Sequence, residues 1–227
     1  MLAFLGILAS ACQPITAGKP AATATPGDPV AAADAKLYAG DYDGAEAAYR
    51  KLLENPVAQA HYVLLLDYES RFGEAVTQAR AAVAAHPDSV SLGRLTRALD
   101  WSEDVTGAVE AGGRAVKATP VDPLAHVFYS EALADSARFG TARVELKAGE
   151  AAARGAYAIA EVEREWSNYY RGLGDVVEEL NHLQLSIKAQ PAFPERQLEL
   201  ARYLYGQQKP DAARALLNSI RKKHPTW

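Results

Sequence analysis

Apolar residues from about position 30 to the C-terminus recur with the spacing of amphipathic helices. No segment alternates apolar and polar residues with a period of two, and no run rich in Val, Ile and Thr is bounded as a strand would be. Alanine runs such as residues 81–82 and 151–153 favour helix and allow neighbouring helices to approach closely. The pattern predicts an all-α fold over residues 30–227.

The predicted helices are organised in repeats. Residues 71–75 (RFGEA) and 138–142 (RFGTA) share a turn sequence and lie 67 residues apart, which is close to two periods of about 34 residues. Residues 40–45 (GDYDGA) are a third copy of the same turn. A repeat of this length indicates pairs of helices stacked along the chain.

Each turn leads to a small residue, and a proline follows 11 or 12 residues later. A small residue lets two helices approach, and proline prevents a helix from continuing. Pro120 and Pro191 are 71 positions apart, and the segment between them contains one further repeat with Arg154 and Gly155 in place of its proline. The opening positions are Ala45, Ala75, Ala108, Glu179 (a departure) and Ala213, and the closing prolines are Pro56, Pro87, Pro120, Pro191 and Pro225. Six helix pairs over residues 30–225 are therefore expected.

This arrangement resembles the tetratricopeptide repeat (TPR) family, in which a Gly-Asp-Tyr-like turn leads to an alanine that opens the second helix. The resemblance covers the chain from residue 30 onward. It implies a TPR-like α–α superhelix, a right-handed solenoid of about six helix pairs, with the first helix of each pair on the concave side.

Local signals refine this expectation. Asp43 with Glu46 three residues later predicts a capping box at the start of the second helix. Pro210 suits the first turn of the last helix. Repeat five departs from the pattern, and either a longer first helix or an irregular insertion over residues 150–165 would account for it. No polar capping helix follows residue 225, so the last helix is a candidate surface for pairing with another copy.

The N-terminus reads as an export signal. Residues 1–11 (MLAFLGILASA) are apolar, end in small residues and are too short to span a bilayer. The only cysteine, Cys12, follows them as in a bacterial lipobox, although Ala9 stands in the usual leucine position and no basic residue precedes the apolar run. We expect a signal peptide with a lipobox-like cysteine over residues 1–12, lipidation of Cys12, and a flexible Pro/Ala/Thr-rich tether over 13–29.

Composition narrows the function. A net charge of −4 and a pI of about 5.8 disfavour nonspecific binding to nucleic acid or anionic lipid. The sequence holds no HExxH, GxSxG or phosphate-loop motif, and no two of its five histidines are three or four residues apart. Glu161, Glu163 and Glu165 alternate along one predicted helix, which is typical of a solvated surface. We expect no enzymatic activity, no cofactor and no bound metal.

The repeat frame predicts which residues line the concave groove. Tyr68, Trp101 and Tyr205 are its candidate aromatic anchors, and acidic residues dominate the early half while basic residues dominate the late half. The candidate partner-binding residues are Tyr38, Asp67, Tyr68, Arg97, Asp100, Trp101, Glu131, Asp135, Asn168, Arg171, Arg202 and Tyr205. The alternative is that these aromatic residues pack between neighbouring first helices.

The resemblance is closest to bacterial TPR lipoproteins, which include pilotins and outer-membrane assembly factors. It implies an adaptor anchored to a membrane of the bacterial cell envelope that binds a protein or peptide in the groove. Two alternatives remain open: a self-assembling structural protein, which pairs through its uncapped C-terminal helix, and an enzyme or small-ligand carrier that uses the groove.

Overall fold

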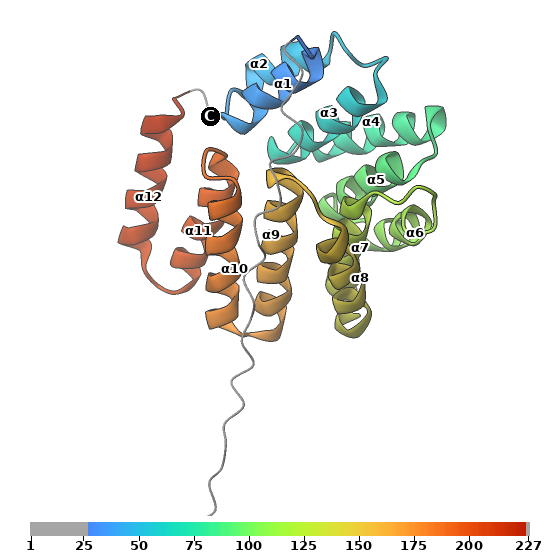
Figure 1. The fold of residues 1–227 in the computed structure, drawn as a ribbon. Coiled ribbons are helices and arrows are strands. Elements are labelled where there is room, and N and C mark those ends of the chain that lie inside the picture. The colour runs from blue at the N-terminus through green and yellow to red at the C-terminus, as the bar shows by residue number, and fades with distance from the viewer. Residues whose placement is uncertain (1–26, 226–227) are drawn as a thin grey trace, which may run out of the picture.

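The structure, a computed structural model, describes residues 27–225, which form twelve helices and no strand (Figure 1). The predicted all-α fold of six helix pairs is confirmed. The helices are α1 (Pro29–Tyr38), α2 (Tyr42–Tyr49), α3 (Pro56–Tyr68), α4 (Phe72–Ala85), α5 (Ser89–Trp101), α6 (Val105–Ala115), α7 (Pro123–Asp135), α8 (Phe139–Ala152), α9 (Ala156–Leu173), α10 (Val176–Ala189), α11 (Pro194–Gly206) and α12 (Pro210–Lys223). The predicted signal segment, Cys12 and most of the predicted tether lie outside the described residues.

All six pairs are joined by the same turn. The residue two places before the second helix has a positive φ in each pair: Gly40, Ser70, Glu103, Ala137, Gly174 and Gln208. The next residue donates its backbone N–H to a carbonyl five residues earlier, over 2.8–3.0 Å. This is the Schellman closure of a helix C-terminus, and it fixes the angle at which each second helix returns.

The small residue of each repeat lies in the interface of its pair. Ala45, Ala75, Ala108 and Ala142 have no exposed surface. Glu179 is buried in the same position of the fifth pair, where its carboxylate accepts a hydrogen bond of 2.7 Å from Arg171 Nε. A longer side chain is tolerated there because an arginine neutralises its charge.

The structure tests three local predictions about where helices begin and end. Pro210 is the first residue of α12, as predicted. The capping box at Asp43 is wrong, because the cap of α2 is Asp41, whose carboxylate accepts from Gly44 N–H. Pro56 does not close the first pair but opens α3, because α2 ends early at Tyr49.

The departure in repeat five is a longer first helix. Helix α9 has 18 residues and begins after Gly155, which has a φ of 83°. Residues 153–155 form the loop that replaces the missing proline of the preceding repeat. Within the described chain, no helix is both long and apolar enough to cross a membrane.

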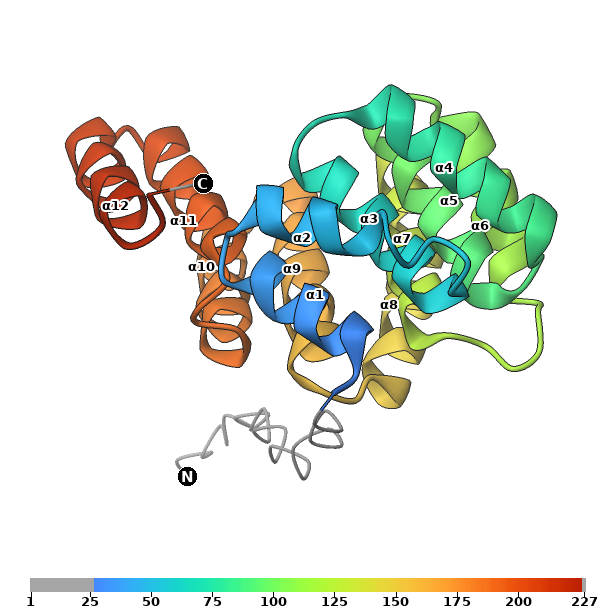
Figure 2. The same ribbon diagram turned by 90° about the horizontal axis from the view of Figure 1, so that it is seen from above.

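The superhelix closes on itself, so that the last pair contacts the first. The Tyr42 hydroxyl donates to Glu195 over 2.7 Å, and His224 Nδ1 donates to the Ala39 carbonyl over 2.7 Å. Tyr38 at the end of α1 packs edge-on against Phe193. Figure 2 shows α1 and α2 lying over α9. The concave side is therefore an interior and not an open groove.

Candidate functional site

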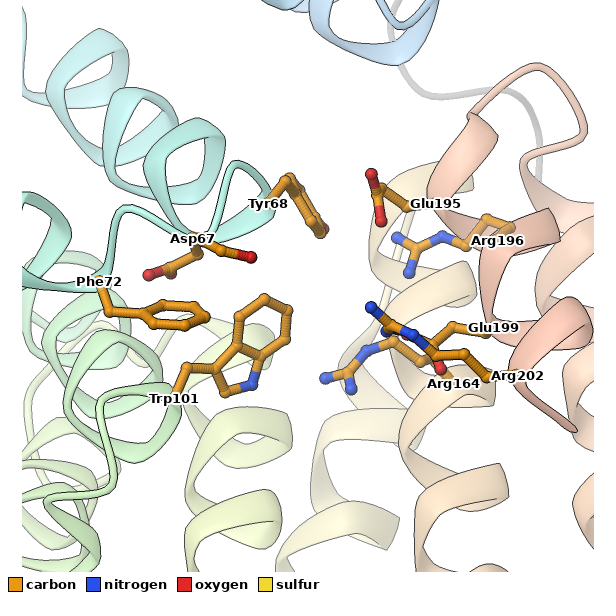
Figure 3. A pocket seen from close by; sticks show the side chains of 10 residues that line it. Asp67, Tyr68, Phe72, Trp101, Arg164, Glu195, Arg196, Glu199 and Arg202 are labelled. Atoms are coloured by element: carbon orange, nitrogen blue, oxygen red, sulfur yellow. Dashed lines mark hydrogen bonds and ion pairs between the residues drawn. The ribbon is translucent and has the colours of Figure 1, made fainter. Parts of the chain in front are cut away.

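A cavity of about 230 Å³ lies where α3, α4 and α5 face α9 and α11 across the closed superhelix (Figure 3). Two walls of different chemistry oppose each other there. The lining residues are Asp67, Tyr68, Ser70, Phe72, Trp101, Arg164, Glu195, Arg196, Glu199 and Arg202.

One wall is aromatic. Tyr68 and Trp101 are the last residues of α3 and α5, and the repeat places them side by side with ring centroids 6.1 Å apart in a T-shaped pair. Phe72 begins α4 and meets the Trp101 ring edge-on at 6.4 Å. Such a wall offers a large apolar surface together with the negative faces of aromatic rings.

The opposite wall is charged. Glu195, Glu199 and Arg202 follow one another at helical spacing along one face of α11. Arg202 Nη1 donates to Glu199 over 2.7 Å, and its side chain is 62% exposed, which places it at the mouth of the cavity. Arg164 reaches the same wall from α9 (Figure 3).

Beneath this wall lies a buried group of charges that we name the central ion cluster: Arg97, Glu131, Glu161, Arg164 and Arg196. The Glu161 carboxylate is fully buried and accepts from three arginines, at 2.6 Å from Arg196, 3.0 Å from Arg164 and 3.2 Å from Arg97. Burial opposes its charge, but the arginines outweigh this cost and hold its pKa well below the usual value.

Glu131 on α7 completes the cluster. Its two carboxylate oxygens accept from both terminal nitrogens of Arg164, at 2.9 and 2.7 Å, in a bidentate pair. It also accepts from Trp101 Nε1 at 3.1 Å. Burial works against its ionisation, yet Arg164 lowers its pKa. The central ion cluster thus ties the aromatic wall to α9.

Arg97 stands behind the aromatic wall without any exposed surface. Its guanidinium carbon lies 4.0 Å from the Trp101 ring centroid and 4.8 Å from that of Tyr68. These are cation–π distances. The wall therefore already holds one cation on its inner side.

Two carboxyl groups near the cavity lack a hydrogen-bond partner among the described residues. Both oxygens of Asp67 and both of Asp100 are buried and accept no hydrogen bond. Burial raises the pKa of each to about 8, because a desolvated carboxylate is costly and Glu131 adds repulsion. Only Asp67 lines the cavity.

The predicted groove residues divide into three groups by exposure. Asp67, Arg97, Asp100 and Glu131 are buried; Tyr38, Tyr68, Trp101 and Asn168 are partly buried; Asp135, Arg171, Arg202 and Tyr205 are exposed. The structure brings Asp67, Tyr68, Trp101 and Arg202 together in the cavity. Tyr205 is 72% exposed and does not line it. The acidic and basic halves of the predicted groove face each other and do not follow one another along an extended channel.

The interpretation of Glu161, Glu163 and Glu165 as a solvated surface is wrong, because all three are at most 5% exposed. On α11, sequence reasoning predicted Arg202 but missed Glu195, Arg196 and Glu199. The available signal was the helical spacing of Glu195, Glu199 and Arg202. Among the described residues, no group of three or more His, Cys, Asp or Glu side chains could hold a metal ion.

Comparison with solved structures identifies the fold. The thermophilic TPR protein TTC0263 of Thermus thermophilus is similar at a TM-score of 0.60 and 16% identity, over 78% of this chain and 97% of that one. A chain of the APC/C hetero-tetramer Cut9–Hcn1 is similar at a TM-score of 0.58 and 12% identity, over 88% of this chain and 40% of that one. A tetratricopeptide repeat protein of Parabacteroides merdae is similar at 0.51 and 11% identity, over 86% and 78%.

No protein-family model matches the sequence, and the comparison with curated proteins finds no match. The structural likenesses, together with the repeated turn and the six helix pairs, show that this chain has the TPR fold.

Proposed function

We propose that this protein is a non-enzymatic interaction scaffold that takes a short segment of a protein partner into its central cavity. This proposal rests on the cavity, in which an aromatic wall opposes a charged wall. Clefts that combine aromatic anchors with a few polar groups are typical of binding sites for peptides and small molecules.

The size of the cavity limits what enters. The central ion cluster and the rings of Tyr38, Phe193 and Tyr68 occupy the rest of the concave side. An extended peptide along the whole solenoid would have to displace these buried groups. A single side chain or a chain terminus needs only the cavity, so the partner presents a short segment at the mouth beside Arg202.

A peptide array tests this proposal with two matched variants of the full chain. Arg202→Glu reverses a charge at the mouth, where Arg202 pairs with Glu199 three residues earlier. Arg214→Glu reverses a charge on α12, where an exposed Arg214 pairs with Asp211 at the same spacing, away from the cavity. We expect the unmodified chain and Arg214→Glu to bind the same peptides and Arg202→Glu to bind a different set, because the charge at the mouth changes sign.

Other outcomes point elsewhere. If both variants bind the same peptides as the unmodified chain, the binding face lies outside the cavity. If no peptide binds, the scaffold proposal fails. A thermal shift produced by a small metabolite alone would then favour a small-ligand carrier, and a mass that rises with concentration would favour self-assembly through α12.

Anchoring to the cell envelope is a separate proposal that rests on the sequence alone. The apolar segment before Cys12 and the tether after it support an exported lipoprotein. Such a protein could assist assembly of an envelope complex, as pilotins and outer-membrane assembly factors do. Metabolic labelling with an alkyne fatty acid tests it: the full chain should be labelled and a Cys12→Ser variant should not. Equal labelling of both would refute lipidation at Cys12.

A further inference from the structure

The charges that line the cavity are not equally neutralised. Each of its three arginines already has a carboxylate partner: Arg164 pairs with Glu131 and Glu161, Arg196 with Glu161, and Arg202 with Glu199. An anionic ligand would have to compete with one of these carboxylates. The existing pairs therefore make the cavity a poor receptor for acidic groups.

Asp67 is the exception. Its side chain is 1% exposed and lines the cavity, and neither of its oxygens accepts a hydrogen bond from any described residue. Arg97 is the cation with the largest influence on it, but that guanidinium donates to Glu161 and lies against the Trp101 ring. Asp67 thus forms no ion pair within residues 27–225, although buried carboxylates in proteins are normally paired.

The groups beside Asp67 suit a positive charge as well. Tyr68, Phe72 and Trp101 form the wall to which Asp67 belongs (Figure 3). Aromatic faces attract ammonium and guanidinium groups, most strongly where water is excluded. Arg97 demonstrates this on the inner side of the same wall, at 4.0 Å from Trp101.

We propose that the cavity selects a cation, and that the partner segment inserts a lysine-type ammonium group between the Asp67 carboxylate and the aromatic wall. The proposal rests on the scaffold function argued above and names the chemistry that this site recognises. A cation gives Asp67 its missing ion pair and breaks none of the existing ones. A neutral or acidic side chain of similar length leaves Asp67 without a partner.

Ionisation of Asp67 is coupled to this binding. Burial raises its pKa to about 8, so only about a tenth of it is ionised at pH 7. The charged groups that act on it are Arg94 and Arg97 on α5, Glu131 on α7 and Glu161 on α9. A bound ammonium favours the ionised form, so affinity for a cation should rise about tenfold between pH 7 and pH 9.

The test uses three tripeptides with blocked ends and the ¹⁵N-labelled full chain. The central residue of the tripeptide is lysine, ε-acetyl-lysine or glutamate, flanked by alanines. Binding is followed at pH 7 and pH 9 through the indole N–H signal of Trp101. We expect the lysine peptide to bind at least about tenfold more tightly than the other two at pH 9, where its ammonium is still charged.

Two variants with matched chemistry assign the effect. Asp67→Asn replaces the carboxyl group by a neutral group of the same shape, and it should abolish both the preference for lysine and the rise in affinity with pH. Asp100→Asn makes the same change at a second buried carboxyl group that lacks a hydrogen-bond partner and lies outside the cavity lining, and it should preserve both.

Each contrary result has a distinct meaning. Equal binding of the three peptides, tighter binding of the glutamate peptide, or unchanged selectivity in Asp67→Asn would overturn the cation proposal and leave the scaffold function intact. Failure of all three peptides to bind overturns the cation proposal too. The array with Arg202→Glu then decides separately whether the cavity receives any peptide.

Discussion

The central ion cluster makes a sharp prediction about one carboxylate. Glu161 on α9 has no exposed surface and accepts hydrogen bonds from side chains on α3, α5, α9 and α11. The donors are Arg196 at 2.6 Å, Tyr68 at 2.8 Å, Arg164 at 3.0 Å and Arg97 at 3.2 Å. We predict that Glu161→Gln is among the most destabilising isosteric changes in this protein.

The magnitude follows from burial. Glutamine removes the negative charge, leaves three guanidinium groups without their common partner and turns an amide N–H₂ toward them. Removing one partner of a buried ion pair costs about 3–5 kcal/mol, because the other charge is left buried without compensation. Domains are stable by about 5–15 kcal/mol in total. With a urea m-value of about 2–3 kcal/mol/M, the midpoint of unfolding should fall by about 1–2.5 M.

Glu165 provides the control. It lies one helical turn further along α9 and is equally buried. Burial raises its pKa well above the usual value, and repulsion from Glu131 adds to this, so its charged form is disfavoured where that of Glu161 is favoured. Glu165→Gln should therefore cost less than about 1 kcal/mol, the range of a neutral hydrogen bond. Urea titrations followed by far-ultraviolet circular dichroism compare the two variants directly.

The pH dependence checks the same reasoning. The folded-state pKa of Glu161 is depressed, so its contribution is present above the unfolded-state value of 4.5 and is lost as pH falls toward the folded-state value. The difference in stability between the unmodified chain and Glu161→Gln should shrink below about pH 4. Equal losses in Glu161→Gln and Glu165→Gln at pH 7, or a loss in Glu161→Gln below about 1 kcal/mol, would refute the structural account of the cluster.

Further predictions concern protonation, the repeated turn and the closure. The pKa of Asp67 is raised from 3.8 to about 8, so the folded state loses stability as pH rises across that range, by at most about 1.4 kcal/mol per pH unit. Asp67→Asn should flatten the pH profile of urea unfolding. Relative to the unmodified chain, the variant should be more stable at pH 8 than at pH 5. Ala137 has a φ of 60°, so Ala137→Gly should raise stability by about 1 kcal/mol in thermal melts, and no change would argue against turn strain. Gly40→Ala and Gly174→Ala introduce the same backbone strain, but only at Gly40 does the new Cβ meet Pro194, at 3.0 Å. Gly40→Ala should therefore destabilise the fold more, and it should enlarge the radius of gyration in solution scattering. Equal effects of the two variants would show that the closure contributes nothing to stability.

The repeated turn illustrates what sequence reasoning predicts well. The turn at residues 71–75 and its copies were recognisable because each depends on neighbours within a few residues: a positive-φ position, a cap and a small residue. Local hydrogen bonds and steric limits are the same wherever the turn occurs. The exceptions are Asp41, which caps α2 in place of the predicted Asp43, and Pro56, which opens α3 because α2 ends at Tyr49.

Glu161 illustrates what sequence reasoning missed. A glutamate in an alternating Glu pattern on a helix resembles a solvated residue, and its three arginine partners lie 3, 35 and 64 positions away. The helical spacing links Glu161 to Arg164, but no local pattern points to Arg97 or Arg196. Their meeting depends on the curvature summed over several repeats, which brings Arg97 of α5 and Arg196 of α11 to the same carboxylate on α9.

The sequence by itself determined the helices, the six turns and the repeat that gives the TPR fold, because these depend on short-range backbone geometry and on the size of one residue per pair. Only the tertiary structure decided that the superhelix closes through Tyr42, His224 and Phe193 and that its concave side is a charged interior that contains a small cavity. The reason is physical: small rotations between successive pairs accumulate along a solenoid, so distant side chains meet or miss according to a sum that no single repeat contains.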